Sequence, residues 1–354
     1  MPSRVHVPEG RELVIEPCAP FRLDLTAWAL RRRAHNAVDR WDPSTYQRVV
    51  TLDGTPVALA VTQNSTLDAP RLTVALTGRP IDHPTAALAR STVDRLLGLS
   101  VDLAPFAAMA AADPLLGPLA RRMRGLKPPR FASVFEALVN GVACQQLSLA
   151  VGIHLLNRLT AEHGRPVAHD AAGPRAFPDP DQLATLQPHE LNRHGFSLTK
   201  ARTIIETAQA IVAGALDLES LQRLDDSAAI ARLTSLRGIG RWTAEYVLLR
   251  GLGRLHVFPG DDIGAHNKLK RLFEIDTPLD YDTVHQLVAH WHPYAGVVYF
   301  HLLLQSLSED GLLAEESANP GTRPHGSLYG RPAERSDEFN DRVANPGVLS
   351  LEDR

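Results

Sequence analysis

The chain has 354 residues, of which 44% are hydrophobic and 22% charged. This length and balance predict two globular domains and exclude a largely disordered chain. The formal net charge of −3, from 37 basic and 40 acidic residues, excludes a polybasic nucleic-acid coat, so a DNA-binding role requires a local basic face.

Cysteine content and hydropathy set further limits. Cys18 and Cys144 are the only cysteines, which excludes a disulfide scaffold and four-cysteine zinc or iron–sulfur sites. The sequence has no run of about eighteen apolar residues, and residues 1–10 lack the apolar stretch of a secretory signal. We therefore expect no membrane span, no signal peptide and a cytoplasmic protein.

The first part of the chain, residues 1–111, predicts a small mixed α/β domain. Short runs rich in Val, Leu and Thr, bounded by Gly, Asp and Pro, predict strands at 12–17, 47–54, 55–65 and 71–78. Helical patterns lie between and after them, at 23–35 and 83–100. Strands mixed with helices predict a sheet with helices on one face, and so an α+β fold class for the chain as a whole.

From residue 112 to 310 the strand signal fades and helical patterns follow one another. The segments are 131–164, which we interpret as two helices, and then 198–216, 226–236, 241–252 and 283–307. Residues 311–354 are rich in Pro, Gly, Arg and acidic residues with few large apolar groups, which predicts a flexible tail. The prediction is thus an α/β domain, a helical domain and a tail.

A tight turn between two helices is the most informative segment. A helix is expected to end near Leu236, Gly238, Ile239 and Gly240 form the turn, and a new helix begins near Arg241. Glycine at both turn positions permits positive φ and a close approach of another backbone. The free N–H groups and the dipole of the second helix would bind an anion such as a DNA phosphate. A simple corner between helices is the alternative interpretation.

Two adjacent aspartates follow the turn, in the segment Val257-Phe-Pro-Gly-Asp-Asp262. Asp261 and Asp262 are expected at the start of a helix that runs to Phe273. A carboxylate at this position can cap the helix, or it can face a cleft. From the residues alone both interpretations stay open, one aspartate serving each role.

Together these segments resemble the helix–hairpin–helix superfamily of DNA glycosylases. The match lies in Leu-x-Gly-Ile-Gly-x-x-Thr-Ala, which includes Thr243, and in the Phe-Pro-x-x-Asp segment. The resemblance implies that Asp262 is the catalytic residue and Asp261 is structural. An ionised carboxylate near C1′ would stabilise the positive charge that develops on the sugar, and it could orient or deprotonate the attacking water.

Within this superfamily, Gly-Ile-Gly-Arg-Trp-Thr-Ala-x-Tyr resembles the 3-methyladenine DNA glycosylase II type. The resemblance places Trp242 and Tyr246 in the base pocket, although aromatic residues four apart on a helix are also common in cores. Aromatic faces suit a cationic alkylated purine. Members that cut the DNA strand have a lysine at the position of Trp242, so we expect base release without a lyase step.

Other positions depart from this type. Ala295 and Gly296 replace an Arg-Ser pair, a pocket tryptophan is expected at Leu303, and an aromatic residue is often found at Ile263. Either Tyr299 or Phe300 could supply the missing aromatic residue. The sequence therefore leaves the range of damaged bases open.

The resemblance also implies contacts with DNA. The segment Cys144-Gln145-Gln146-Leu-Ser resembles the loop that enters the minor groove, and Gln146 matches the residue that fills the gap left by a flipped nucleotide. Lys200, in Gly195-Phe-Ser-Leu-Thr-Lys-Ala, matches a lysine or arginine that supports the site or contacts phosphate. Lys268, Lys270 and Arg271 are further candidates for backbone contact.

The function predicted from these residues is a monofunctional DNA glycosylase that excises N3- and N7-alkylated purines. The alternatives are a glycosylase for another modified base such as hypoxanthine, and a non-catalytic DNA-binding module. Double-stranded DNA is the expected partner, the protein is expected to be a monomer, and no cofactor or side-chain metal site is expected. The sequence leaves open whether the hairpin backbone binds a monovalent cation.

Overall fold

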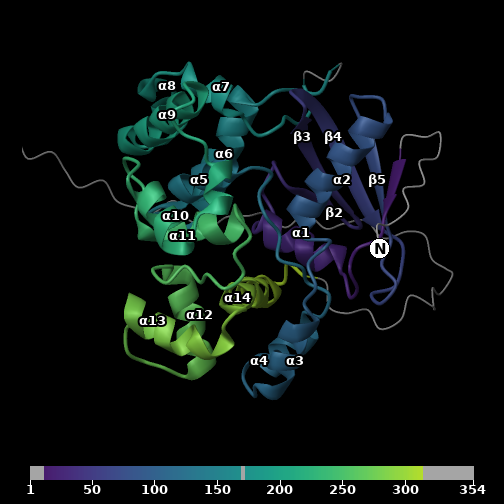
Figure 1. Cartoon of the computed structure of the whole chain (residues 1–354), viewed down its shortest axis with the longest axis vertical. Coiled ribbons are helices and arrows are strands. Elements are labelled where there is room, and N and C mark those ends of the chain that lie inside the picture. The colour runs from purple at the N-terminus through teal and green to yellow at the C-terminus, as the bar shows by residue number, and fades with distance from the viewer. Residues whose placement is uncertain (1–11, 169–171, 314–354) are drawn as a thin grey trace, which may run out of the picture. The chain divides into compact units, whose positions relative to one another are not determined.

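The computed structural model describes residues 12–168 and 172–313, in which a β-sheet precedes a series of helices (Figure 1). The predicted α+β fold class is confirmed. The predicted tail, 311–354, lies outside the described residues apart from its first three positions. Among the described helices, none combines the length and the apolar composition that crossing a membrane requires.

The sheet is antiparallel throughout and has the strand order β1-β5-β4-β3-β2. On β4, Val57, Leu59 and Val61 are buried while their neighbours are partly exposed, as expected when one face of a sheet packs on a core. The short strand β2 was not predicted, because three residues cannot show an alternating pattern. The strands are β1 (Glu12–Ile15), β2 (Arg40–Asp42), β3 (Thr45–Leu52), β4 (Thr55–Gln63) and β5 (Leu72–Thr77).

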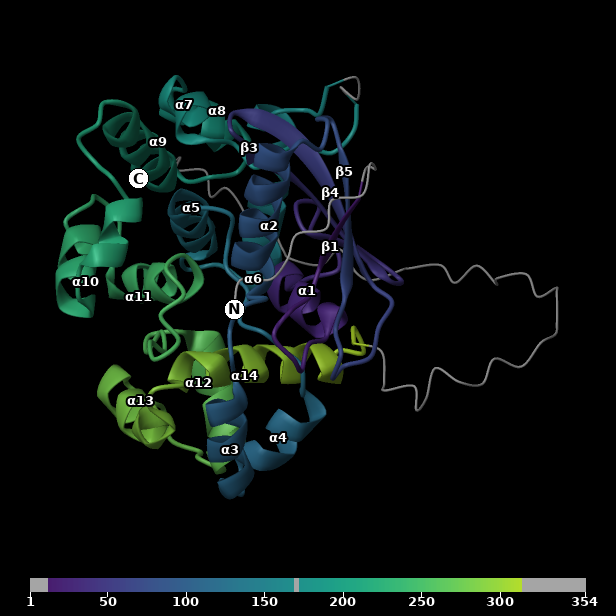
Figure 2. The ribbon, with the colours of Figure 1, turned by 45° about the vertical axis from the view of Figure 1, so that its right-hand side comes forward.

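Two helices pack against this sheet. They are α1 (Leu23–Arg31) and α2 (His83–Leu97), and both contact β3. Figures 1 and 2 show α2 running along the sheet. Its buried Val93, Leu96 and Leu97 belong to the same apolar cluster as the buried face of β4.

The rest of the described chain is helical, as predicted. The predicted helix at 283–307 is wrong in one respect: it is two helices separated by Pro293, which lacks an N–H and disfavours helical backbone at the preceding residue. The elements are α3 (Ala104–Ala112), α4 (Leu116–Arg122), α5 (Val134–Cys144), α6 (Leu149–His163), α7 (Pro180–Ala184), α8 (Pro188–Arg193), α9 (Leu198–Val212), η1 (Glu219–Arg223), α10 (Asp226–Thr234), α11 (Arg241–Arg250), α12 (Ile263–Phe273), α13 (Tyr281–Val288), η2 (Ala289–Trp291) and α14 (Ala295–Glu309).

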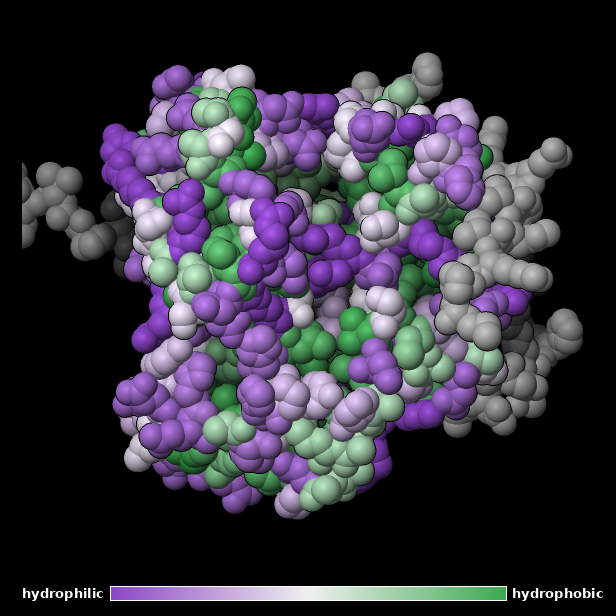
Figure 3. Space-filling model, in the orientation of Figure 1, coloured by the Kyte–Doolittle hydropathy of each residue, from purple (hydrophilic) through white to green (hydrophobic). Residues whose placement is uncertain are grey.

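Two apolar clusters meet at α11. The first runs from the sheet into α5, α6 and α9 and includes Tyr246, Val247 and Leu248. The second joins α1, α3 and α4 to α12, α13 and α14, and it includes Leu249. Figure 2 shows α14 beside α12 and below α1. In Figure 3, hydrophilic residues cover most of the visible face, with hydrophobic residues in a recess near its centre.

A buried ion-pair network connects the sheet to α5. Arg48 on β3 is 1% exposed and contacts Asp39 at 2.7 Å and Glu136 on α5 at 2.6 Å. The Tyr46 hydroxyl donates to the same Asp39 carboxylate at 2.7 Å. These contacts fix the position of α5, whose C-terminal end begins the loop that holds Gln145 and Gln146.

Candidate active site

Side chains from several parts of the chain line a cavity of about 690 Å³. The segment after α1 contributes Arg32 and Arg33, the loop between α5 and α6 contributes residues 144–149, and α11, α12 and α14 supply further walls. Residues that the sequence analysis assigned to catalysis, base binding or DNA binding meet here: Asp262, Trp242, Tyr246, Gln145 and Gln146.

The two oxygens of the Asp262 carboxylate have different partners. One caps the helix that follows, and the other accepts hydrogen bonds from two aromatic side chains. Oδ1 accepts a hydrogen bond from the Ala265 N–H at 2.9 Å and so caps α12. Oδ2 accepts from Trp242 Nε1 at 3.2 Å and from the Tyr299 hydroxyl at 2.9 Å. The sequence predicts a capping role for one aspartate and a cleft-facing role for the other, but in the structure the single carboxylate of Asp262 does both.

The neighbouring Asp261 has a local partner of opposite charge. It forms an ion pair with Arg241, Nε to Oδ2, at 3.0 Å. The Arg241 guanidinium also lies 3.4 Å from the centre of the Tyr281 ring. The charge of Asp261 is thus compensated at the start of α11, whereas Asp262 has no ion pair within the described residues.

Glu245, which the sequence analysis missed, holds the loop before Asp262 against α11. Its side chain is buried and accepts hydrogen bonds from the Gly260 N–H at 3.0 Å and the Tyr281 hydroxyl at 2.6 Å. The available signal was a charged residue among the mostly apolar residues 243–249 of this helix, because a charge that such a helix buries needs partners. Glu245 is therefore a positioning residue for the loop that ends in Asp262.

Trp242 and Tyr246 form one wall of the cavity. Their rings stack with centroids 5.4 Å apart and an interplanar angle of 28°, which confirms that they share a helix face. The Tyr246 hydroxyl accepts a hydrogen bond from Arg32 Nη1 at 2.8 Å, and Arg32 Nη2 donates to Asn140 Oδ1 at 2.6 Å. Arg32, which was not predicted from the sequence, therefore holds the tyrosine hydroxyl in position.

Of the two aromatic residues left open by the sequence, Tyr299 reaches the cavity. It lines the cavity together with Leu303 and donates to Asp262. Burial, and then the negative charge of Asp262, raise the pKa of Tyr299 well above its ordinary value, so the hydroxyl keeps its proton. Phe300 is fully buried and packs on the Arg250 guanidinium, 5.1 Å from its ring centre.

The predicted turn between helices is confirmed, with α10 ending at Thr234 and α11 beginning at Arg241. Only Gly238 uses positive φ, at 75°, and a Cβ there would collide with Thr203 Oγ1. Gly240 does not use this freedom, since its φ is −96°. A Cβ on Gly240 would meet nothing within 4 Å, so this glycine leaves open space in front of the first turn of α11.

These two glycines predict different results on substitution by alanine. Gly238→Ala should destabilise the fold by at least about 1–2 kcal/mol, because alanine is strained at positive φ. Gly240→Ala should cost less than about 1 kcal/mol but should weaken duplex binding on the order of tenfold by blocking the approach of a phosphate. Thermal unfolding and a binding titration check both results. Wild-type affinity in Gly240→Ala would show that no phosphate approaches this turn.

The glutamine loop is attached to the hairpin. Gln145 Nε2 donates to the Gly238 carbonyl at 3.0 Å and to Thr243 Oγ1 at 2.9 Å. Lys200 Nζ donates to the carbonyls of Ala143 and Gln145 at 3.0 and 2.7 Å. Lys200 is thus placed as a support of the loop rather than at a phosphate, and Gln145 holds loop and hairpin together.

The residues of this region that remain free for DNA are fewer than the sequence suggested. Thr243 is 1% exposed and Ile239 is 5% exposed, so the side chains of these two residues are not available to DNA. Gln146 is exposed with φ of 54°, and Leu147 beside it is 44% exposed. The left-handed backbone at Gln146 places these two side chains at the tip of the loop.

No group of three or more His, Cys, Asp or Glu side chains suited to a metal ion occurs among the described residues. The question of a monovalent cation at the hairpin concerns backbone carbonyls. One of them, Gly238 O, already accepts the hydrogen bond from Gln145.

Comparison with known proteins agrees with this geometry. A family model described as "HhH-GPD superfamily base excision DNA repair protein" matches residues 139–293, and one described as "AlkA N-terminal domain" matches residues 14–133. The first match contains the glutamine loop, the hairpin and Asp262.

Individual proteins extend the likeness. A DNA-3-methyladenine glycosylase of Bacillus subtilis (strain 168) is 33% identical over 204 residues, 58% of this chain and 67% of the relative. DNA-3-methyladenine glycosylase 2 of Escherichia coli (strain K12) is 29% identical over 53% of this chain and 63% of its own length. The solved structure of a 3-methyladenine DNA glycosylase from Archaeoglobus fulgidus has a TM-score of 0.74 at 25% identity, covering 83% of this chain and 97% of its own. The chain therefore belongs to the HhH-GPD superfamily of base excision DNA repair proteins, and within it to the 3-methyladenine DNA glycosylase II type.

Proposed function

We propose that the protein is a monofunctional DNA glycosylase that excises N3- and N7-alkylated purines from duplex DNA. The observation that carries this proposal is the position of Asp262 Oδ2, which lies in the cavity between Trp242 and Tyr299 and next to the hairpin helix. The names of the Bacillus subtilis and Escherichia coli relatives support the same substrate class. A DNA substrate agrees with the expected cytoplasmic location.

The proposed reaction begins with extrusion of the damaged nucleotide. The first turn of α11 binds backbone phosphate through free N–H groups. The exposed Gln146 enters the space that the nucleotide leaves, which offsets part of the few kcal/mol lost in unstacking and unpairing. The base then lies against the stacked rings of Trp242 and Tyr246.

Cleavage of the glycosidic bond leaves positive charge on the sugar. The Asp262 carboxylate stabilises this charge, and the hydrogen bonds from Trp242 and Tyr299 hold Oδ2 in place before the reaction. Water adds to C1′ and transfers its proton to the carboxylate. An N-alkylated purine leaves as a neutral base, so its departure needs no general acid.

We further propose that no lyase step follows. Trp242 stands at the helix position where strand-cutting members have a lysine, and its Nε1–H is already bonded to Asp262. An indole nitrogen cannot form the Schiff base that begins strand cleavage. Because Trp242 supplies no nucleophile at this position, we propose that water attacks C1′.

One observation favours a second candidate substrate, a neutral modified purine such as hypoxanthine. The cavity is lined by Arg32 and Arg250, whose side chains are 4% and 0% exposed. Two buried positive charges disfavour a cationic base and favour a neutral base with acceptor atoms. The choice between the two classes is the main question for the substrate assay.

Single-turnover release assays test the function. Duplexes carrying 7-methylguanine, 3-methyladenine, hypoxanthine or 8-oxoguanine would be incubated with the protein, and abasic sites would be revealed by alkali. We expect release of the methylated purines, and strand breaks only after alkali treatment. Release of hypoxanthine alone would favour the second candidate, and release of none of these bases would contradict the proposal. Strand breaks before alkali would contradict the absence of a lyase step.

A further inference from the structure

Lys268 is a cation at the cavity to which the proposed reaction gives no role. It lines the cavity and lies six residues after Asp262, roughly 9 Å along the axis of α12. Within the described residues its amine has no hydrogen bond and no ion pair. Burial lowers the pKa of Lys268, the Asp262 carboxylate opposes that shift, and the positive charges of Arg33 and Arg271 add to it.

Arg33 and Arg271 also line the cavity. Within the described residues their ion-pair partners are exposed acids at the end of α14: Arg33 contacts Asp310 at 4.0 Å, and Arg271 contacts Glu309 at 3.2 Å. Their other hydrogen bonds go to the carbonyls of Arg32 and Asn267, which carry no compensating charge. Ion pairs of this exposed kind contribute little and are easily exchanged. All three cations are therefore available to bind an added anion. Lys268 is the most available, because its charge has no ion-pair partner within the described residues.

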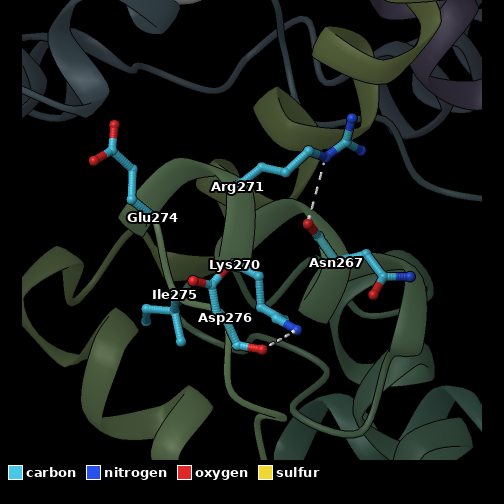
Figure 4. Close-up of a pocket in the computed structure, with 6 residues that line it drawn as sticks. All are labelled: Asn267, Lys270, Arg271, Glu274, Ile275 and Asp276. Carbon is cyan, nitrogen blue, oxygen red and sulfur yellow. Dashed lines mark hydrogen bonds between the residues drawn. The ribbon is translucent and has the colours of Figure 1, made fainter.

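The neighbouring Lys270 provides an internal comparison. Its amine donates to the Asp276 carbonyl at 3.0 Å, in a neighbouring groove at the C-terminal end of α12 that shares only Asn267 and Arg271 with the cavity (Figure 4). Lys270 does not line the cavity that contains Asp262. The two lysines of this helix thus differ in two respects: Lys268 lines the cavity and its amine is free among the residues described, whereas the Lys270 amine is bonded outside the cavity.

We propose that Lys268, together with Arg33 and Arg271, binds a DNA phosphate next to the flipped nucleotide. This inference rests on the proposed function, because it requires duplex DNA with a nucleotide in the cavity. The contact is separate from the one expected at Gly240, since Lys268 lies on α12 and the hairpin precedes α11. A DNA backbone bound by both α11 and α12 would hold the sugar of the flipped nucleotide beside Asp262.

The salt dependence of binding tests the charge of this contact. Affinity of the full-length protein would be measured for a duplex with a tetrahydrofuran abasic analogue, over a range of salt concentrations. Lys268→Gln should weaken binding on the order of tenfold and lower the slope of log K against log salt by about 0.9. Lys268→Arg should restore the slope, and Lys270→Gln should leave it at the wild-type value. Equal slopes for Lys268→Gln and wild type would overturn the proposal.

A neutral linkage identifies the phosphate. Single methylphosphonate groups would replace the phosphates on either side of the analogue, one at a time. At one linkage the wild type should lose on the order of tenfold in affinity, and Lys268→Gln should lose nothing further. Independent, additive losses at every linkage would refute the contact. The release assay tests the proposed function separately: if the wild-type protein releases no base, the proposed function fails whatever the salt dependence of binding.

Discussion

Replacement of Asp262 by asparagine should slow base release by at least about 10²–10³-fold, because it removes the charge that we propose stabilises the cationic sugar. Asparagine is as good a helix cap as aspartate, so the bond from Ala265 and the start of α12 should persist. Affinity for a duplex with an abasic analogue should stay within a few-fold of wild type. Single-turnover release of 7-methylguanine and a binding titration give the two values.

The adjacent Asp261 is the matched control. Its carboxylate already pairs with Arg241, and its side chain is 38% exposed. Asp261→Asn removes an exposed ion pair, which is worth about 1 kcal/mol or less, so release should fall by less than about tenfold. Full activity of Asp262→Asn would show that Asp262 is only a helix cap, and equal losses in the two variants would show that the effect is not specific to Asp262.

The largest loss of stability is expected for Glu136→Ala. The substitution leaves Arg48, which is 1% exposed, without one of its two carboxylate partners. Breaking a buried pair costs about 3–5 kcal/mol in unfolding free energy, and the remaining Asp39 places the expected loss near the lower value. Urea unfolding followed by fluorescence measures this loss as a shift in midpoint.

The exposed pair between Arg71 and Glu16 gives the control for this change. Its side chains are 64% and 66% exposed, so Glu16→Ala should cost less than about 1 kcal/mol. Because α5 leads to the glutamine loop, Glu136→Ala should also weaken DNA binding. Similar midpoints for the two variants would show that the buried network does not stabilise the fold.

Much of the fold could be predicted from local patterns in the sequence. Alternating apolar residues reveal β4, helical spacing reveals α2, and two glycines reveal the turn before α11, because each pattern depends on residues close together in the chain. The short strand β2 and the break at Pro293 were missed for opposite reasons. One is too short for a pattern, and the other lies inside a long apolar run that resembles a single helix.

The site could be predicted only in part. Asp262, Trp242 and Tyr246 lie within motifs, so the sequence identifies them. The Arg32 contact with Tyr246 joins residues 214 positions apart, and no local pattern carries that information. The double role of Asp262 depends on Tyr299, which reaches it from α14. Contacts between helices distant in sequence decide these roles, and they follow from tertiary packing.

A charged sugar analogue tests the central claim most directly. Duplexes would contain either a pyrrolidine ring, which carries a cationic nitrogen, or the neutral tetrahydrofuran ring at the damaged position. Wild-type protein should bind the cationic analogue at least about 100-fold more tightly, as enzymes do with mimics of the transition state. Asp262→Asn should lose most of this preference while binding the neutral duplex normally. An equal preference in both proteins would contradict the account, because the charge on the sugar would then be stabilised by some other group.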